Sequence, residues 1–230
     1  DLIISGNETR TIENCEYHLN GTITVKDNAT LIVRNGILNQ TSRDIFAGIV
    51  VKNRASFFLT NATLIILQQN VTTTSRAWIT GRIWVLDEAN MYIANSKIEN
   101  LKKDVSIWAE GQSRVSIENS VMRRARENAT YWTLEACVVV TDGYSEVHIK
   151  NLLFDRVTIY GSSRVFIERA TMRDAIRIFQ SPTVYASDST IGYVTADGSP
   201  SVNIRSSTIK SHISIRESSN VWLIRTSVPE

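Results

Sequence analysis

The sequence has no run of 18 or more apolar residues and does not begin with a charged leader followed by an apolar stretch. A membrane-spanning helix needs about 20 mostly apolar residues. We therefore expect no membrane span in this chain and, if the protein is exported, a signal peptide that has already been removed. Charge of one sign is also scarce, since 25 Lys and Arg face 23 Asp and Glu, for a net charge of +2. This balance excludes the basic stripe typical of nucleic-acid binders.

What the sequence does contain is a repeat. The stretch SPSVNIRSSTIKSHISI from Ser199 matches SSRVFIERATMRDAIRI from Ser162 in its apolar and small positions. An apolar anchor residue, followed two residues later by a second apolar residue in most copies, occurs nine times, at Leu31, Phe57, Met91, Val115, Val147, Val165, Val184, Val202 and Val221. Apolar positions two residues apart predict a strand with one buried face.

Further apolar positions lie on both sides of each anchor. One lies seven residues after it, and in most copies a pair lies eight and six residues before it, as in Ile176 and Ile178 before Val184. Each repeat is therefore expected to contain three short strands joined by corners. Four residues after the anchor, five successive copies carry asparagine, which tolerates the left-handed backbone conformation of a tight bend and can form a hydrogen-bonded ladder along the stack. These corner residues are Asn35, Asn61, Asn95, Asn119 and Asn151.

Three strands per repeat, a repeat length of 18 or 19 residues in the regular part, and the corner asparagines resemble the right-handed parallel β-helix proteins of the pectin-lyase-like group. The resemblance extends to secreted cell-surface β-helix proteins of archaea. It implies an all-β, single-domain solenoid of about nine coils over residues 23–230. Residues 1–22 are expected to form an N-terminal strand and a cap or partial coil.

The residue between the anchor and the next inward position should face outward. Five of the nine such positions are aromatic, and we name the whole line of nine the ring row. Its aromatic members are Phe58, Tyr92, Phe166, Tyr185 and Trp222. Exposed rings indicate a sugar-binding platform or a protein contact. The third interpretation is that a loop of the same chain covers them, with Trp78, Tyr131 or Trp132 as the cover.

Catalytic and metal-binding patterns are weak. The ring row contains no carboxylate, whereas a carboxylate-dependent hydrolase needs two acids held close together. Asp155 and Asp174 occupy matching positions, but Arg156 and Arg173 beside them favour an ion-pair ladder. The three histidines, His18, His148 and His212, fall at different places in the repeat. We expect no enzyme activity, no metal and no cofactor.

Seven N-x-T triplets indicate a glycosylated, exported protein. We expect Asn61 to stay unmodified because a ladder asparagine uses its amide internally, and we expect Asn39, Asn70 and Asn128 to be good acceptors in loops. The full set of expected acceptors is Asn7, Asn20, Asn28, Asn39, Asn70 and Asn128. Cys15 and Cys137 lie about four repeats apart, too far for a disulfide within the chain, so buried free thiols are expected, with an intermolecular disulfide as the alternative.

Four long insertions, 39–48, 65–82, 99–106 and 123–138, leave from the same corner and should lie along one edge. The sequence favours an extracellular structural protein that assembles head to tail with copies of itself into a filament, sheath or surface layer. The expected assembly ends are Leu2, Ile3, Ile4, Val221 and Leu223. The alternative is a module that binds or cleaves a polysaccharide along the ring row or the loop edge.

Overall fold

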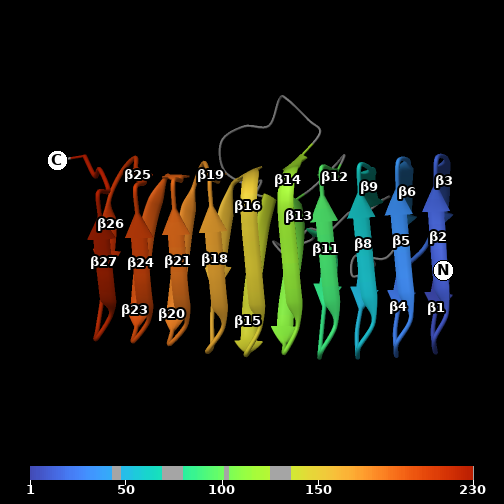
Figure 1. Ribbon diagram of the computed structural model, residues 1–230, viewed down its shortest axis with the longest axis horizontal. Helices are drawn as coiled ribbons and strands as arrows, with labels where there is room; N and C mark the ends of the chain where they lie inside the picture. The colour runs from blue at the N-terminus through green and yellow to red at the C-terminus, as the bar shows by residue number, and fades with distance from the viewer. Residues whose placement is uncertain (43–47, 69–79, 101–103, 125–135, 230) are drawn as a thin grey trace, which may run out of the picture.

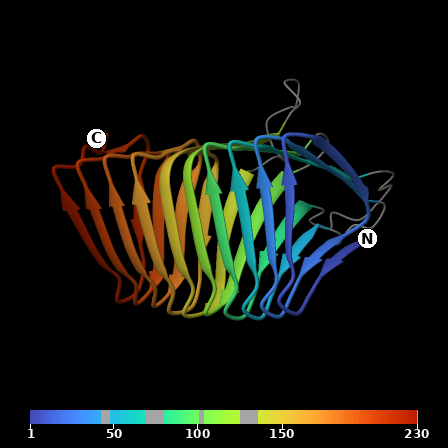
Figure 2. The same ribbon diagram turned by 45° about the vertical axis from the view of Figure 1, so that its right-hand side comes forward.

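The computed structural model describes residues 1–42, 48–68, 80–100, 104–124 and 136–229. These residues form strands and no helix, which confirms the expected all-β class. The strands lie across the long axis of the molecule and follow one another along it, with the two chain ends at opposite ends (Figure 1). Seen after rotation, the strands wrap around this common axis (Figure 2).

The strands form three parallel rows, and the chain visits rows A, B and C in that order in each repeat. Row A is the ten-stranded sheet of β1 (Leu2–Ile4), β4 (Ile23–Val25), β7 (Ile49–Val51), β10 (Thr80–Val85), β13 (Asp104–Gly111), β15 (Ala136–Gly143), β17 (Arg156–Ile159), β20 (Ala175–Gln180), β23 (Tyr193–Gly198) and β26 (Ile213–Ile215).

Rows B and C belong to one 17-stranded sheet, because β14 (Arg114–Arg124) and β16 (Glu146–Phe154) run through the corner and pair in both rows. The other strands of row B are β2 (Thr9–Glu13), β5 (Thr30–Arg34), β8 (Ser56–Thr60), β11 (Asn90–Ala94), β18 (Arg164–Glu168), β21 (Thr183–Ser187), β24 (Ser201–Arg205) and β27 (Asn220–Ile224). Row C adds β3 (Glu16–Asn20), β6 (Ile37–Ser42), β9 (Thr63–Gln68), β12 (Lys97–Asn100), β19 (Thr171–Met172), β22 (Thr190–Ile191) and β25 (Thr208–Ile209).

The core is one continuous apolar cluster enclosed by the three rows. It forms because successive side chains of a strand point to opposite faces. In β8, for example, Phe57 and Leu59 are fully buried while Phe58 between them is half-buried. The long parallel sheets and their shared core are compatible with a β-helix.

Residues 2–20 also supply one strand to each row. β1, β2 and β3 pair in parallel with β4, β5 and β6. Arg10 pairs with the anchor Leu31, which is why a search for apolar anchors does not find this repeat.

The corner between rows A and B joins adjacent repeats through side-chain acceptors. Asp27 Oδ2 accepts a hydrogen bond from the backbone N of Gly6 at 3.1 Å, and Asp87 Oδ2 accepts one from Asn53 N at 3.0 Å. The bond from Gly6, with help from Asn53, holds the pKa of Asp27 below its usual value. Both aspartates and Asn53 have a positive φ, between 61° and 65°, so this position requires residues that accept the left-handed conformation.

Candidate functional site

The ring row lies along the outer face of row B. Each member pairs directly with the next, from Ile32 to Trp222. Tyr185 and Trp222 are the most exposed of its aromatic side chains, at 47% and 49%. The row is therefore a line of side chains spaced by the distance between strands, about 4.8 Å.

Three consecutive members form a stack. The ring centroids of His148 and Phe166 are 4.6 Å apart with planes inclined by 13°, and those of Phe166 and Tyr185 are 5.4 Å apart with planes inclined by 9°. Stacking turns the ring faces toward one another, so the ring edges face solvent. A sugar that packs on ring faces has no platform within this stack.

His148 is a member of this stack, a role that the sequence did not indicate. Its Nε2 lies 2.8 Å from Glu146 Oε1, and this contact lowers the pKa of Glu146. Nearer the N-terminus, Tyr92 packs at a tilt against Phe58, with centroids 6.3 Å apart. The Tyr92 hydroxyl donates to Glu118, which raises the pKa of Tyr92.

The ring row is interrupted twice, at Ser116 and at Asn203. Beside the second interruption the surface is hollowed between the ring row and the next outward line of side chains. Asn203 Oδ1 accepts a hydrogen bond from Arg205 Nε at 3.0 Å. The hollow is lined by Phe166, Ile167, Glu168, Tyr185, Ala186, Ser187, Asn203 and Arg205.

A second aromatic cluster lies on the outer face of row A. The rings of Trp84 and Trp108 have centroids 5.1 Å apart, and the Arg82 guanidinium carbon lies 5.3 Å and 5.0 Å from them. This cluster was not predicted from the sequence, because the ring row covers the outward positions of the central strand only. The same alignment of the I-W-V and I-W-A triplets in β10 and β13 would have found it.

Of the two acids in the ion-pair ladder expected from the sequence, Asp174 has two basic partners, Arg156 as expected and Arg177 in place of Arg173. Asp174 Oδ2 lies 3.2 Å from Arg156 Nε and 3.7 Å from Arg177 Nη2. Arg177 also donates to the hydroxyl of Tyr193. The side chain of Arg156 is buried, so this ion pair links two repeats in a partly desolvated setting.

All five corner asparagines have a left-handed backbone, with φ between 48° and 52°. Asn14 and, in later repeats, Arg169, Asp188, Ser206 and Arg225 adopt the same conformation, so the corner itself imposes it. Asn151 Nδ2 donates to Asn119 Oδ1 at 2.6 Å, and Asn151 Oδ1 accepts from Arg169 Nε at 2.9 Å.

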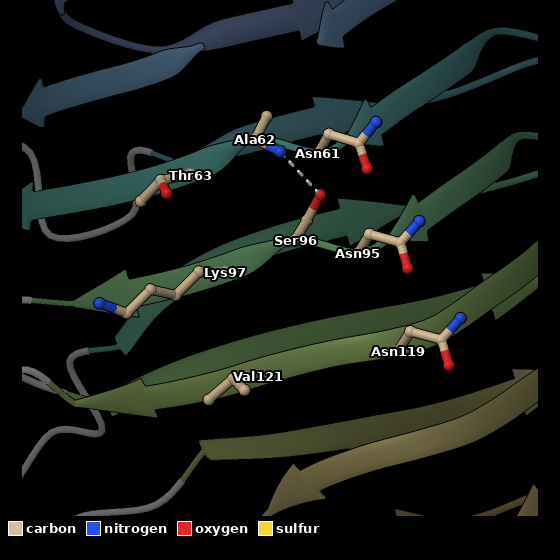
Figure 3. Close-up of a pocket in the computed structure, with 8 residues that line it drawn as sticks. All are labelled: Asn61, Ala62, Thr63, Asn95, Ser96, Lys97, Asn119 and Val121. Atoms are coloured by element: carbon tan, nitrogen blue, oxygen red, sulfur yellow. Dashed lines mark hydrogen bonds between the residues drawn. The ribbon is translucent and has the colours of Figure 1, made fainter. Parts of the chain in front are cut away.

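The other asparagines make no such contact among the described residues. Asn61, Asn95 and Asn119 line a shallow groove and point outward side by side (Figure 3). Asn61 is exposed, and no hydrogen bond of its side chain amide is found among the described residues, so the structure gives no internal use of this amide that would keep Asn61 unmodified.

The hydrogen-bonded ladder runs through the next residue of the corner. Ser96 Oγ accepts from Ala62 N at 3.2 Å (Figure 3), and Ser120 Oγ accepts from Ser96 N at 3.1 Å. Ser189 and Ser207 repeat the pattern. Each serine also donates to a carbonyl two residues earlier in its own repeat, as Ser96 does to Ala94 at 2.6 Å. In the sequence this position is small in most copies, as at Gly36, Ala62 and Ser120, and the small size alone does not indicate a ladder.

Replacing Asn119 by leucine is expected to lower the free energy of unfolding by about 1 to 3 kcal/mol. Leucine is strained in the left-handed backbone conformation of this corner, and it removes the oxygen that accepts a hydrogen bond from Asn151. Asn119→Gly is the matched control: it loses the same side chain but tolerates the backbone, so its loss should be smaller. Urea denaturation followed by circular dichroism measures both. Equal stability of the leucine variant and the parent would contradict the backbone argument.

The expected glycosylation sites lie in different settings. Asn7 and Asn28 are exposed and adjacent at the corner between rows A and B, where Asn28 Nδ2 donates to Asn7 Oδ1 at 3.2 Å. Asn20 is exposed at the end of β3. Asn39 is not in a loop as expected: it lies within β6, paired on both sides, because regular pairing continues to Ser42. Asn70 and Asn128 lie outside the described residues.

Cys15 is exposed rather than buried. It follows the bend at Asn14 in the first repeat, where a neighbouring repeat lies on one side only. For Cys137 the structure describes the backbone, which pairs with Ser106 and Arg156 in row A.

Of the long insertions, 65–82 and 123–138 lie largely outside the described residues, as do Trp78, Tyr131 and Trp132.

Within the described ranges, no group of three or more His, Cys, Asp or Glu is placed to hold a metal ion. In the same ranges no helix has the length and hydropathy needed to cross a bilayer.

No family model, no curated protein and no solved structure matches this chain. The geometry described above is therefore the basis on which a function can be proposed.

Proposed function

We propose that this chain is a right-handed parallel β-helix that acts as a structural module outside the cell and stacks end to end with further copies of itself. The observation that carries the proposal is the apolar end surface formed by β26 and β27. Ile215 and Leu223 are 50% and 41% exposed there, whereas their partners one repeat earlier, Ala196 and Ile204, are buried.

The N-terminal end of the molecule, formed by β1, β2 and β3, has strands in the positions that pairing with the C-terminal end of another copy requires. The first strands of rows A, B and C begin at Leu2, Thr9 and Glu16. The last repeat has its equivalent positions in the same three rows, each 211 residues later, at Ile213, Asn220 and Ser227. A second copy could therefore extend all three rows in register. The unpaired N–H and C=O groups of an edge strand favour such an addition, and a head-to-tail contact of this kind continues as a fibre.

Arg10 reduces the apolar area that two stacked copies would bury. Arg10 stands where other repeats carry an apolar anchor, so the stacked ends would bury less apolar surface than an internal repeat. Assembly is therefore expected to depend on protein concentration.

Right-handedness is proposed because connections between parallel strands of one sheet are right-handed in about 98% of cases. The extracellular location and the glycosylation rest on the seven N-x-T triplets. The resemblance to archaeal cell-surface proteins would suit a sheath or surface layer.

The test is polymer formation by the 230-residue chain, measured by sedimentation and electron microscopy over a range of concentrations. Leu223→Asp should abolish polymers because it places a charge in the apolar end. Tyr144→Asp is the matched control, since Tyr144 is 75% exposed and belongs to an internal repeat; it should assemble like the parent.

Deletion of residues 1–5 removes β1 and should also prevent polymers while the β-rich circular dichroism spectrum is retained. A parent that remains monomeric at high concentration would overturn the proposal. Polymers that persist in both the Leu223→Asp variant and the deletion variant would also overturn it.

A further inference from the structure

The interruption of the ring row at Asn203 leaves a gap between two exposed rings. Asn203 pairs with Tyr185 on one side and with Trp222 on the other. Strands two apart in a sheet are separated by about 9.6 Å, and stacked rings are typically 4.5 to 7 Å apart. One additional ring-sized group therefore fits midway, above the short side chain of Asn203.

The ring of Tyr185 is oriented for such a group. One of its faces packs on Phe166 at 5.4 Å with nearly parallel planes. Its opposite face consequently looks along the row, across Asn203 and toward Trp222. Tyr185 and Trp222 are each about half exposed, at 47% and 49%.

The surroundings of the gap are polar. Arg205 Nε donates a hydrogen bond to Asn203 Oδ1. The amide nitrogen of Asn203 is therefore the group that can donate a hydrogen bond to a ligand. Arg205, Ser187 and Glu168 line the adjoining hollow. The charge of Glu168 is already matched by Lys150 at 3.5 Å and Arg169 at 2.5 Å, which leaves hydrogen-bonding groups rather than a strong negative charge.

We propose that this gap is a binding site for one pyranose ring, held between Tyr185 and Trp222 and hydrogen-bonded by Asn203 and Arg205. The polar surroundings favour a sugar over an aromatic side chain, whose edges would leave these groups unpaired. A ring held between two aromatic faces must present C–H groups on both of its own faces. Only pyranoses with equatorial substituents, such as β-glucosyl and N-acetyl-β-glucosaminyl residues, do so.

This site is independent of the proposed end-to-end assembly. Binding is therefore measured on the 230-residue chain, at protein concentrations at which sedimentation shows a monomer. The probes are cellotetraose, chitotetraose and a β-1,4-galactotetraose, and the readouts are titration calorimetry and tryptophan fluorescence. The first two ligands should bind, and the galactose ligand, in which the oxygen at C4 is axial, should bind at least tenfold more weakly.

Asn203→Tyr fills the gap and is expected to reduce binding at least tenfold while leaving the unfolding midpoint close to that of the parent. Ser116→Tyr fills the other interruption and is the matched control, with unchanged binding. Absence of binding to every sugar would overturn the proposal. It would likewise be overturned by equal binding of the Asn203→Tyr variant or of the galactose ligand, or by selective binding of a tryptophan-containing peptide.

Discussion

Replacing Phe57 by alanine is expected to lower the free energy of unfolding by about 3 to 5 kcal/mol. The Phe57 ring is fully buried in the middle of the row B stack, between Leu31 and Met91 of the adjacent repeats. Alanine would remove the ring and leave a cavity that neighbouring strands cannot close, because each is fixed to the next by backbone hydrogen bonds. Urea denaturation followed by circular dichroism measures the loss.

Phe58→Ala is the matched control, since Phe58 belongs to the same strand and faces outward. Its contact is the tilted packing against Tyr92 at 6.3 Å. An aromatic pair of this kind contributes about 0.5 to 1.5 kcal/mol beyond area burial, so this variant should lose far less stability than Phe57→Ala. Equal losses in the two variants would contradict the assignment of inward and outward faces.

The sequence was sufficient to predict these faces because burial imposes the alternation. Each anchor and the apolar residue two positions later must face the core in every repeat that has neighbours on both sides. The same reasoning fails at the ends. Arg10 stands at an anchor position in the first repeat, and Cys15 is exposed there, because the first repeat has a neighbour on one side only.

Contacts between repeats were harder to predict. The insertions change the spacing between equivalent residues, so that Ser96 and Ala62, which are bonded through the serine ladder, are 34 residues apart. A small residue at a corner shows that space is limited. It does not show that a hydroxyl there joins two backbones.

The candidate site was predictable in part for the same reason. The outward aromatic positions follow from the alternation, but whether their rings stack or leave a gap depends on the identity of the residues one repeat away. Asn203 is unremarkable in its own repeat. It becomes a candidate site only when it is seen to pair with both Tyr185 and Trp222.

Replacing Gly192 by alanine is expected to cost about 3 kcal/mol, at the upper end of the usual cost of overpacking. Gly192 alone connects β22 to β23, whereas two residues connect β19 to β20 in the repeat before it and three connect β25 to β26 in the repeat after it. A Cβ atom on Gly192 would lie 1.9 Å from the carbonyl oxygen of Asp174. The same oxygen accepts a hydrogen bond from Tyr193 N at 2.8 Å, so relieving the clash must weaken the pairing of adjacent strands.

Two further variants separate this close approach from a general sensitivity of the corner. Ser211→Ala changes an exposed residue in the equivalent connection one repeat later, and its unfolding free energy should stay within about 0.5 kcal/mol of the parent. Adding one residue after position 192 in the Gly192→Ala variant restores a two-residue connection like Arg173–Asp174. Because the longer connection lets the alanine side chain move away from Asp174, this insertion should recover most of the lost stability. If the insertion destabilises the variant further, the short connection is not the reason that glycine is required.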